Sequence, residues 1–187
     1  SNTGGKAVAL QADLSQEEET STLVSRASDA IGPLTCLVNN ASLFEHDAPA
    51  TVTRESWDTH MQINLRAPFI LSQAFAERVP NTKSCNIINI IDQRVWNLTP
   101  DFTSYTLSKA GLWTLTQTLA MALAPGIRVN AIGPGPTLQS KSQSPDDFSQ
   151  ECAETLLKQQ VTTDEIGRTV RFILDAPSLT GQMIAID

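Results

Sequence analysis

The sequence is poor in basic residues and has no long apolar run. It contains 13 Lys and Arg against 20 Asp and Glu, which gives a net charge of −7. This balance argues against binding to nucleic acids or to anionic membranes, because either would need a basic face. Asn, Gln or Arg interrupts each apolar run within about ten residues, whereas a membrane-spanning helix needs roughly 20. We therefore expect neither a nucleic-acid partner nor a membrane partner.

Cysteines are also few. Cys36, Cys85 and Cys152 are odd in number and widely spaced, and with His46 and His60 they form no metal-ligand pattern. No basic stretch followed by an apolar one opens the chain, so no secretory signal is indicated. We expect the cysteines to be small core residues of a reduced, cytoplasmic protein without a metal site.

The residues that are present follow the pattern of an α/β domain. The chain has 187 residues, of which 41% are hydrophobic and 18% charged, enough for one substantial core over residues 1–187. Short, wholly apolar segments alternate with segments of helical periodicity, which is typical of a parallel sheet with helices on both faces. The expected strands are 7–12, 34–38, 86–91, 127–132 and 183–186. The expected helices are 15–31, 54–64, 68–79, 104–124, 147–159 and 162–175, with a polar loop at 138–147.

The clearest chemical signal lies in residues 92–109. Tyr105 and Lys109 are four residues apart in an expected helix, so their side chains face the same way. Asp92 follows the expected strand 86–91, at the end where an open α/β sheet holds its ligands. A phenol, an ammonium and a carboxylate in one crevice can transfer protons. The alternatives are a partly exposed Tyr–Lys pair and an aspartate that only caps the next turn.

Three further motifs give the chain a family resemblance. They are Asn39-Asn40-Ala41 after one strand, Asn64 in the following helix, and Pro134-Gly135 after a later strand. Together with the Tyr–Lys spacing, they make essentially the whole chain resemble the short-chain dehydrogenases/reductases. The resemblance implies a Rossmann-like, doubly wound parallel sheet and an oxidoreductase that uses a nicotinamide dinucleotide. It also implies homodimers or homotetramers that associate through helices 54–79 and 104–124.

Asp92 stands where this family usually has a serine. With Ser42-Leu43-Phe44, it makes the chain most similar to the pteridine reductase branch, in which an aspartate replaces the serine and an aromatic residue near this loop stacks on the pterin. An ionised carboxylate would repel the oxyanion that forms in ketone reduction, by about 4 kcal/mol at about 4 Å and an effective dielectric of about 20. It can instead accept hydrogen bonds from a pterin ring.

The expected reaction is therefore hydride transfer to a pterin or dihydropterin. One alternative is a carbonyl or hydroxyl substrate with Asp92 protonated. Another, from a different class, is a non-catalytic homologue or structural subunit. The hypothesis of a non-catalytic homologue gains weight because the family binds its dinucleotide with a Gly-rich turn, G-x-x-x-G-x-G. None of the nine glycines of this chain lies in such a motif. We accordingly expect the chain to lack the first β-α-β segment and to be incomplete at both ends. NADPH is the expected cofactor, with NADH as the alternative.

The resemblance also assigns roles to single residues. Tyr105 would be the general acid, and Lys109 would lower its pKa and hold the nicotinamide ribose. Asn64 would bind a water through its helix backbone and link Lys109 to solvent. Phe44 and Trp96 are candidates for stacking on the substrate beside Asp92 and Tyr105, although either could be a packing residue. The expected cofactor-binding residues are Asp13, Leu14, Asn39, Ala41, Ser42, Tyr105, Lys109, Pro134, Gly135 and Thr137.

Overall fold

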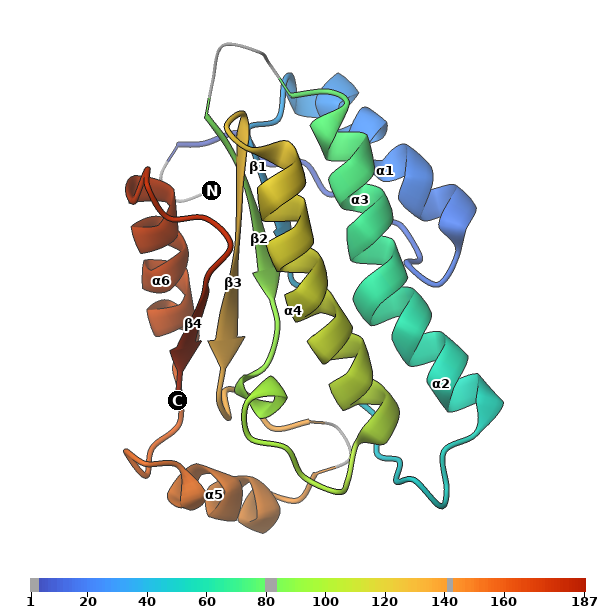
Figure 1. Ribbon diagram of the computed structural model, residues 1–187, viewed down its shortest axis with the longest axis vertical. Helices are drawn as coiled ribbons and strands as arrows, with labels where there is room; N and C mark the ends of the chain where they lie inside the picture. The colour runs from blue at the N-terminus through green and yellow to red at the C-terminus, as the bar shows by residue number, and fades with distance from the viewer. Residues whose placement is uncertain (1–3, 80–83, 141–142) are drawn as a thin grey trace.

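A computed structural model describes residues 4–79, 84–140 and 143–187 (Figure 1). Its four strands pair in parallel, in the order β1-β2-β3-β4. The strands are β1 (Cys36–Asn39), β2 (Cys85–Ile90), β3 (Ile127–Pro134) and β4 (Met183–Ile186). The register places Asn39 opposite Asn89, and Asn89 opposite Ala131, so the carboxyl ends of the first three strands lie together. The predicted parallel α/β sheet is confirmed.

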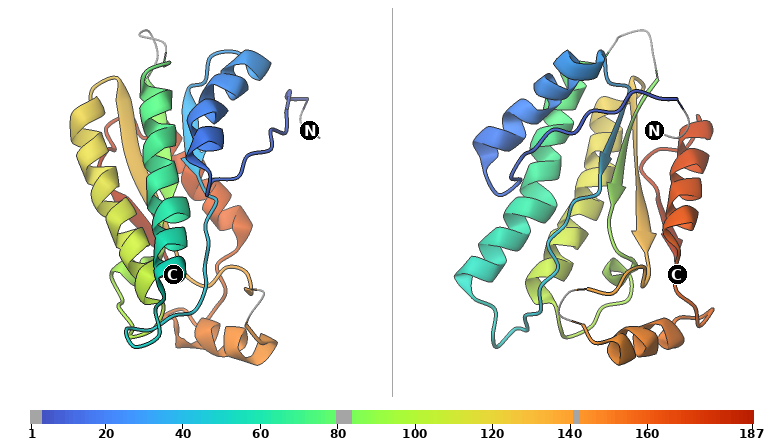
Figure 2. Two further views of the ribbon diagram at one scale, coloured as in Figure 1. Left: turned by 90° about the vertical axis from the view of Figure 1, so that its right-hand side faces the viewer. Right: turned by 180° about the vertical axis from the view of Figure 1, so that it is seen from behind.

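Helices cover both faces of this sheet. The helical segments are α1 (Glu17–Ile31), α2 (Arg54–Met61), η1 (Gln62–Arg66), α3 (Ala67–Ala76), η2 (Gln93–Val95), α4 (Thr103–Leu123), α5 (Pro145–Glu154) and α6 (Thr163–Asp175). Successive residues of a strand point to opposite faces. Ile87 accordingly packs in the core under α1, α3 and α4, while Ile88 packs with Ile173 of α6 on the other face. Figure 2 shows α1 and α3 side by side, with α6 away from them.

The predicted strand at 7–12 is wrong. These residues lie in no strand, and Val8 is 48% exposed. An apolar segment becomes a strand only when a neighbouring strand takes up its backbone hydrogen bonds. This segment is instead tied to α1, where the Lys6 Nζ donates to the Ala30 carbonyl at 2.9 Å and the Arg26 Nη2 donates to the Gln11 carbonyl at 2.9 Å.

The two helices predicted at 54–64 and 68–79 are joined without a break. Pro68 has no N–H to donate to the carbonyl of Asn64, four residues earlier, so a regular α-helix cannot pass through this point. The chain instead widens into the π-helical segment η1, in which the Ala67 N–H donates to the Gln62 carbonyl. Such segments are frequent at functional sites. Here η1 carries Asn64, which is 1% exposed.

Arg128 ties β3 to the end of α6. It is 8% exposed. Its Nη2 donates to the Ile173 and Leu174 carbonyls at 3.0 and 3.1 Å, and its Nη1 donates to the Leu179 carbonyl at 2.8 Å. The last carbonyls of a helix have no partner within the helix, so a buried guanidinium stabilises this end.

We expect Arg128→Met to lower the free energy of unfolding by about 2–4 kcal/mol, because buried carbonyls lose their charged donor. Urea denaturation measures the change. Arg54→Met is the matched control, because Arg54 pairs only with Asp58 on an exposed helical face; its effect should stay within about 0.5 kcal/mol. A loss for Arg128→Met that is no larger than that of the control would contradict the assignment.

Candidate active site

A cavity of about 690 Å³ opens at the carboxyl ends of β2 and β3. In an open parallel sheet this is the edge at which ligands bind. Figure 1 shows α5 lying beyond these strand ends. The walls come from the loop after β1, from η2, from the start of α4, from the turn after β3, and from α5 and α6. The cavity thus gathers side chains from residue 40 to residue 167 of the chain.

Asp92 and Tyr105 meet in this cavity, as the sequence predicts. The Tyr105 hydroxyl donates to Asp92 Oδ2 at 2.8 Å. Asp92 Oδ1 accepts the backbone N–H of Arg94 at 2.7 Å and so caps the short helix η2. Asp92 therefore has both of the roles considered from the sequence: Oδ1 caps the turn, and Oδ2 contacts Tyr105.

The electrostatics of Tyr105 differ from the prediction. Its side chain is 5% exposed, and burial raises the pKa of its phenol well above the ordinary value. The charge and hydrogen bond of Asp92 raise this pKa further, against a weaker opposing effect of Arg94. The predicted lowering by Lys109 is wrong for this arrangement, because Lys109 Nζ lies 5.7 Å from the centre of the Tyr105 ring and donates to the Ile90 carbonyl at 2.9 Å. Tyr105 therefore keeps its proton at neutral pH.

Lys109 is 2% exposed, and its burial lowers the pKa of the ammonium group to about 8, against the opposing charge of Asp92. The ordinary value is 10.5. Between these two pKa values the unfolded chain binds more protons than the folded protein, so stability rises with pH. Since one pKa unit corresponds to about 1.4 kcal/mol, burying the charged Lys109 destabilises the protein by about 3 kcal/mol below pH 8.

We therefore expect the stability of the unsubstituted protein, relative to a Lys109→Met variant, to rise by about 2–3 kcal/mol between pH 7 and pH 10. Urea denaturation of both proteins at several pH values measures this difference. The titration of other groups is shared by the two proteins and largely cancels. A difference that stays constant across this pH range would contradict the assigned burial of the charge.

Asn64 holds the loop that follows β1. Its Oδ1 accepts the Leu43 N–H at 2.8 Å and the Ser42 hydroxyl at 3.1 Å. Its Nδ2 donates to the Leu43 carbonyl at 2.9 Å and to Ser108 Oγ at 3.1 Å. The side chain is thus fully used in positioning the loop against α4. The proposed binding of a water concerns its backbone carbonyl, which Pro68 leaves without its usual donor.

Of the two aromatic candidates, Phe44 lines the cavity and Trp96 does not. Phe44 lies edge-on to Tyr105, with ring centres 4.7 Å apart, and stacks on Phe102 at 4.4 Å. Trp96 is 53% exposed and packs edge-on against Trp113, with ring centres 6.4 Å apart. Trp96 therefore lies outside the cavity that holds Asp92 and Tyr105, because its side chain packs against Trp113 of α4.

The turn after β3 forms another wall. Pro134, Gly135 and Thr137, the residues predicted to lie against the nicotinamide, all line the cavity. The Gly135 N–H donates to the Ile186 carbonyl at 2.8 Å, and the Thr137 hydroxyl donates to the Gly135 carbonyl at 2.9 Å. A Cβ on Gly135 would meet the Asp187 carboxylate, so a larger residue here would require the Asp187 side chain to move.

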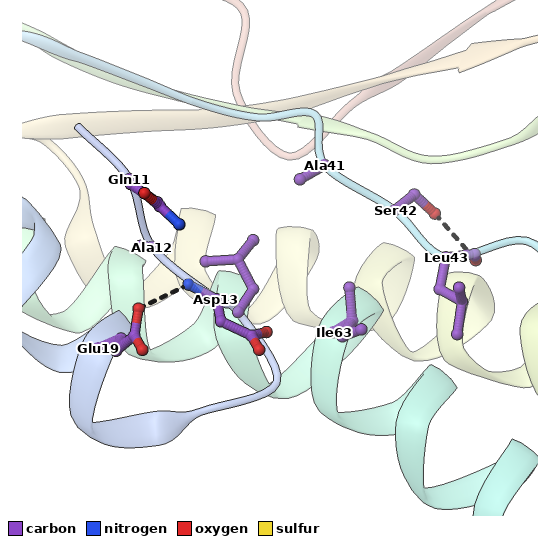
Figure 3. A pocket seen from close by; sticks show the side chains of 9 residues that line it. Gln11, Ala12, Asp13, Glu19, Ala41, Ser42, Leu43 and Ile63 are labelled. Carbon is purple, nitrogen blue, oxygen red and sulfur yellow. Dashed lines mark hydrogen bonds between the residues drawn. The ribbon is translucent and has the colours of Figure 1, made fainter. Parts of the chain in front are cut away.

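All but one of the remaining predicted cofactor residues line a second cavity, of about 610 Å³ (Figure 3). Asp13 lies on one side, and Ala41 and Ser42 lie on the other. Leu14 also lines this cavity. Ser42 also lines the main cavity, so the two hollows adjoin. Asn39 lies apart from both; it is 7% exposed, and its Nδ2 donates to Asn89 Oδ1 at 2.8 Å.

Sequence reasoning missed a buried polar cluster beneath Tyr105. Ser104 donates its hydroxyl to Asp47 Oδ2, and its Oγ lies 2.7 Å from His60 Nδ1. Asp47 Oδ1 accepts the Ser104 N–H at 3.1 Å, and the Asp47 carbonyl accepts the Phe102 N–H at 2.6 Å. Asp47 therefore satisfies free N–H groups at the start of α4, where Phe102 adopts a left-handed conformation with φ 59°. No local motif signals this, because Asp47 and Ser104 are 57 residues apart.

Known proteins share this arrangement along the whole chain. The sequence profile of the family described as enoyl-(acyl carrier protein) reductase matches residues 1–187. A short-chain dehydrogenase/reductase from Serratia marcescens superposes with a TM-score of 0.91 at 26% identity, over 100% of this chain and 77% of that one. The chain belongs to the short-chain dehydrogenase/reductase family. It is accordingly an oxidoreductase of that type.

Two further proteins similar to this chain are named for different substrates. The probable galactose dehydrogenase GalD of Rhizobium meliloti is 30% identical, over 95% of this chain and 72% of its own length. The structure of FolM alternative dihydrofolate reductase 1 from Brucella canis, complexed with NADP, is 49% identical and has a TM-score of 0.94. It is matched over 100% of this chain and 74% of its own length.

The described residues of this short-chain dehydrogenase/reductase fit part of a nicotinamide dinucleotide. Lys109 donates one hydrogen bond, to Ile90, and its other two N–H groups have no partner within the described part of the chain, which leaves donors for ribose hydroxyls. Pro134, Gly135 and Thr137 line the same cavity as Lys109 and form a wall for a flat ring. The two adjoining cavities offer room for the two halves of such a molecule.

Two other classes of site find no support in residues 4–79, 84–140 and 143–187. No group of three or more His, Cys, Asp or Glu side chains there could hold a metal ion. No helix in the same residues is long and apolar enough to cross a membrane. Cys36 and Cys152 form no disulfide within the described part of the chain.

Proposed function

We propose that this protein reduces a C=N bond of a pterin or dihydropterin with NADPH. The observation that carries the proposal is the hydrogen bond from Tyr105 to Asp92, at 2.8 Å, in the cavity at the strand ends. A carboxylate at this position disfavours a developing oxyanion and suits a heterocycle that presents N–H donors. The 49% identity to a protein named an alternative dihydrofolate reductase supports the same substrate class.

The proton chemistry follows from the two buried groups. NADPH, when bound, supplies the hydride. Asp92 accepts N–H groups of the substrate ring and releases the Tyr105 hydroxyl, whose proton passes to a ring nitrogen. Tyr105 holds this proton firmly because burial and Asp92 raise its pKa. Lys109, with a pKa lowered to about 8, is suited to restoring the proton near neutral pH.

Residues around this pair complete the proposed site. Phe44, edge-on to Tyr105, offers an aromatic surface beside the substrate ring. Pro134, Gly135 and Thr137 would face the nicotinamide, and Lys109 its ribose. Asp13, Leu14, Ala41 and Ser42 would surround the adenosine half, in the cavity of Figure 3. The backbone of Asn64 would hold a water between Lys109 and solvent.

We also propose that the protein assembles as a homodimer or homotetramer through α2, α3 and α4. A hollow of about 430 Å³ between these helices is lined by Met61, Leu65, Phe69 and Leu115. Met121 of α4 is also exposed, at 76%, and adds apolar surface to this helix.

A substrate panel tests the proposed activity. The purified protein would be assayed with NADPH and with NADH against dihydrobiopterin, dihydrofolate and a simple ketone. We expect turnover of the dihydropterins and preference for NADPH. Turnover of the ketone alone would favour a carbonyl reductase in which Asp92 is protonated. Absence of NADPH binding at millimolar concentration, measured by calorimetry, would favour a non-catalytic homologue.

A further inference from the structure

Arg94 lies in the wall of the main cavity with its charge only partly paired. Its side chain is 14% exposed. Its Nη1 donates to Thr99 Oγ1 at 2.7 Å, and its Nη2 lies 3.7 Å from Glu151 Oε1 on α5. Its Nε is buried and makes no hydrogen bond within the described part of the chain. Arginine usually binds a carboxylate with two short bonds of about 2.7–2.9 Å, so this contact with Glu151 falls short of what the guanidinium can form.

The guanidinium is held in a constant position relative to the proposed catalytic pair. The backbone N–H of Arg94 donates to Asp92, the residue whose other oxygen accepts a hydrogen bond from the Tyr105 hydroxyl. The side chain lies over the Phe102 ring at 5.0 Å, and Phe102 stacks on Phe44. Stacking on an aromatic face orients a guanidinium without using its N–H donors. The free donors of Arg94 are therefore presented at a set distance from the reacting end of the site.

Glu151 is a weak partner that a ligand can replace. Its side chain is 40% exposed, and its Oε2 accepts a hydrogen bond from Gln143 Nε2 at 2.8 Å. An ion pair that is partly exposed and 3.7 Å long contributes little to stability. The lining of the cavity also includes the apolar side chains of Leu138, Phe148 and Ile166. A substrate with an aromatic group between its pterin ring and a carboxylate could pack that group against these apolar side chains.

Charge in the cavity points to the same kind of ligand. Among the described residues that line it, the cations are Arg94 and Lys109, and the anions are Asp92 and Glu151. Lys109 bonds to Ile90 beneath the proposed nicotinamide position, and Asp92 is engaged with Tyr105. Arg94 is thus the cation that remains for an anionic group on the substrate.

We propose that Arg94 binds a carboxylate on the tail of the pterin substrate, and that Glu151 takes this place when no ligand is bound. The site then prefers a folate-type pterin over one with a neutral tail. The inference rests on the proposed function. It adds the residue that distinguishes pterins with an anionic tail from pterins with a neutral tail.

Binding of two oxidised pterins in the presence of NADP⁺ tests the inference. Folate carries tail carboxylates, whereas biopterin has a neutral tail; neither is turned over under these conditions. Titration calorimetry gives both dissociation constants for the unsubstituted protein, for Arg94→Gln and for Glu151→Gln. We expect Arg94→Gln to reduce the preference for folate over biopterin by tenfold or more, as expected for the loss of a charge-assisted bond. We expect Glu151→Gln to increase that preference about threefold, because a competing carboxylate is removed.

Arg54→Gln, which removes an exposed cation far from the cavity, is the control and should change neither constant. If Arg94 only fastens α5, both Arg94→Gln and Glu151→Gln would weaken the two ligands equally, and the inference would be overturned. An unchanged preference in Arg94→Gln would overturn it as well. Failure of the unsubstituted protein to bind either pterin, while it still binds NADP⁺, would instead refute the proposed function itself.

Discussion

Tyr105→Phe should lower kcat for dihydropterin reduction by about 10³-fold, within the range of about 10²–10⁴ that a positioned general acid contributes. The change removes one oxygen and leaves the ring, which packs against Phe44 at 4.7 Å. The Asp92 carboxylate loses the proton donor 2.8 Å away but keeps its bond to the Arg94 backbone. The site then retains its shape and lacks only the transferable proton.

Oxidation of NADPH, followed by its absorbance, measures the effect on kcat. Calorimetry with NADP⁺ shows whether cofactor binding survives, and we expect its affinity to change by less than about fivefold, since Lys109 remains in place. Thr118→Val is the matched control, because it removes a hydroxyl that, within the described part of the chain, bonds only to the Leu115 carbonyl on the exposed side of the same helix. A loss below tenfold in Tyr105→Phe would mean that another group supplies the proton.

Asp92→Ser should have the second large effect and should act on substrate choice. Loss of the carboxylate removes a charge-assisted acceptor for the pterin ring, and we expect kcat/KM for dihydropterins to fall by about 10²-fold. The same change removes the repulsion of an oxyanion, which amounts to about 4 kcal/mol at about 4 Å. Reduction of a simple ketone should therefore become measurable, with a gain approaching about 10³-fold.

Serine is the appropriate replacement because it preserves the local structure. Asp92 caps η2 by accepting the Arg94 N–H, and serine caps helices about as well as aspartate does. Parallel assays with dihydrobiopterin and a ketone give the ratio of the two specificities. If dihydropterin reduction is unchanged in Asp92→Ser, the carboxylate does not orient the substrate and the pterin hypothesis fails.

Much of the framework follows from local pattern. The apolar segments at 86–91 and 127–132 correspond to β2 and β3, and the periodic segment at 104–124 corresponds to α4. The spacing of Tyr105 and Lys109 on that helix, and the place of Asp92 after β2, were sufficient to predict that these three side chains share one cavity. Helical period and strand alternation are properties of neighbouring residues, so they can be recognised without the fold.

Other features depend on contacts between distant segments. Residues 7–12 have the composition of a strand but pair with none, because pairing depends on what lies beside them. The stack of Phe44, Phe102 and Arg94 joins the loop after β1 to two segments more than 40 residues later. The exposed position of Trp96 and the support of α4 by Asp47 could not be predicted for the same reason.

The sequence alone therefore determined which chemical groups are available: one phenol, one ammonium and one carboxylate at the end of a parallel sheet. The tertiary structure decided their electrostatic state. Burial raises the pKa of Tyr105 and lowers the pKa of Lys109 to about 8, and Asp92 raises the pKa of Tyr105 further. Such shifts depend on how completely the fold excludes water and on which charge it places nearby, and neither quantity is contained in the spacing of residues along the chain.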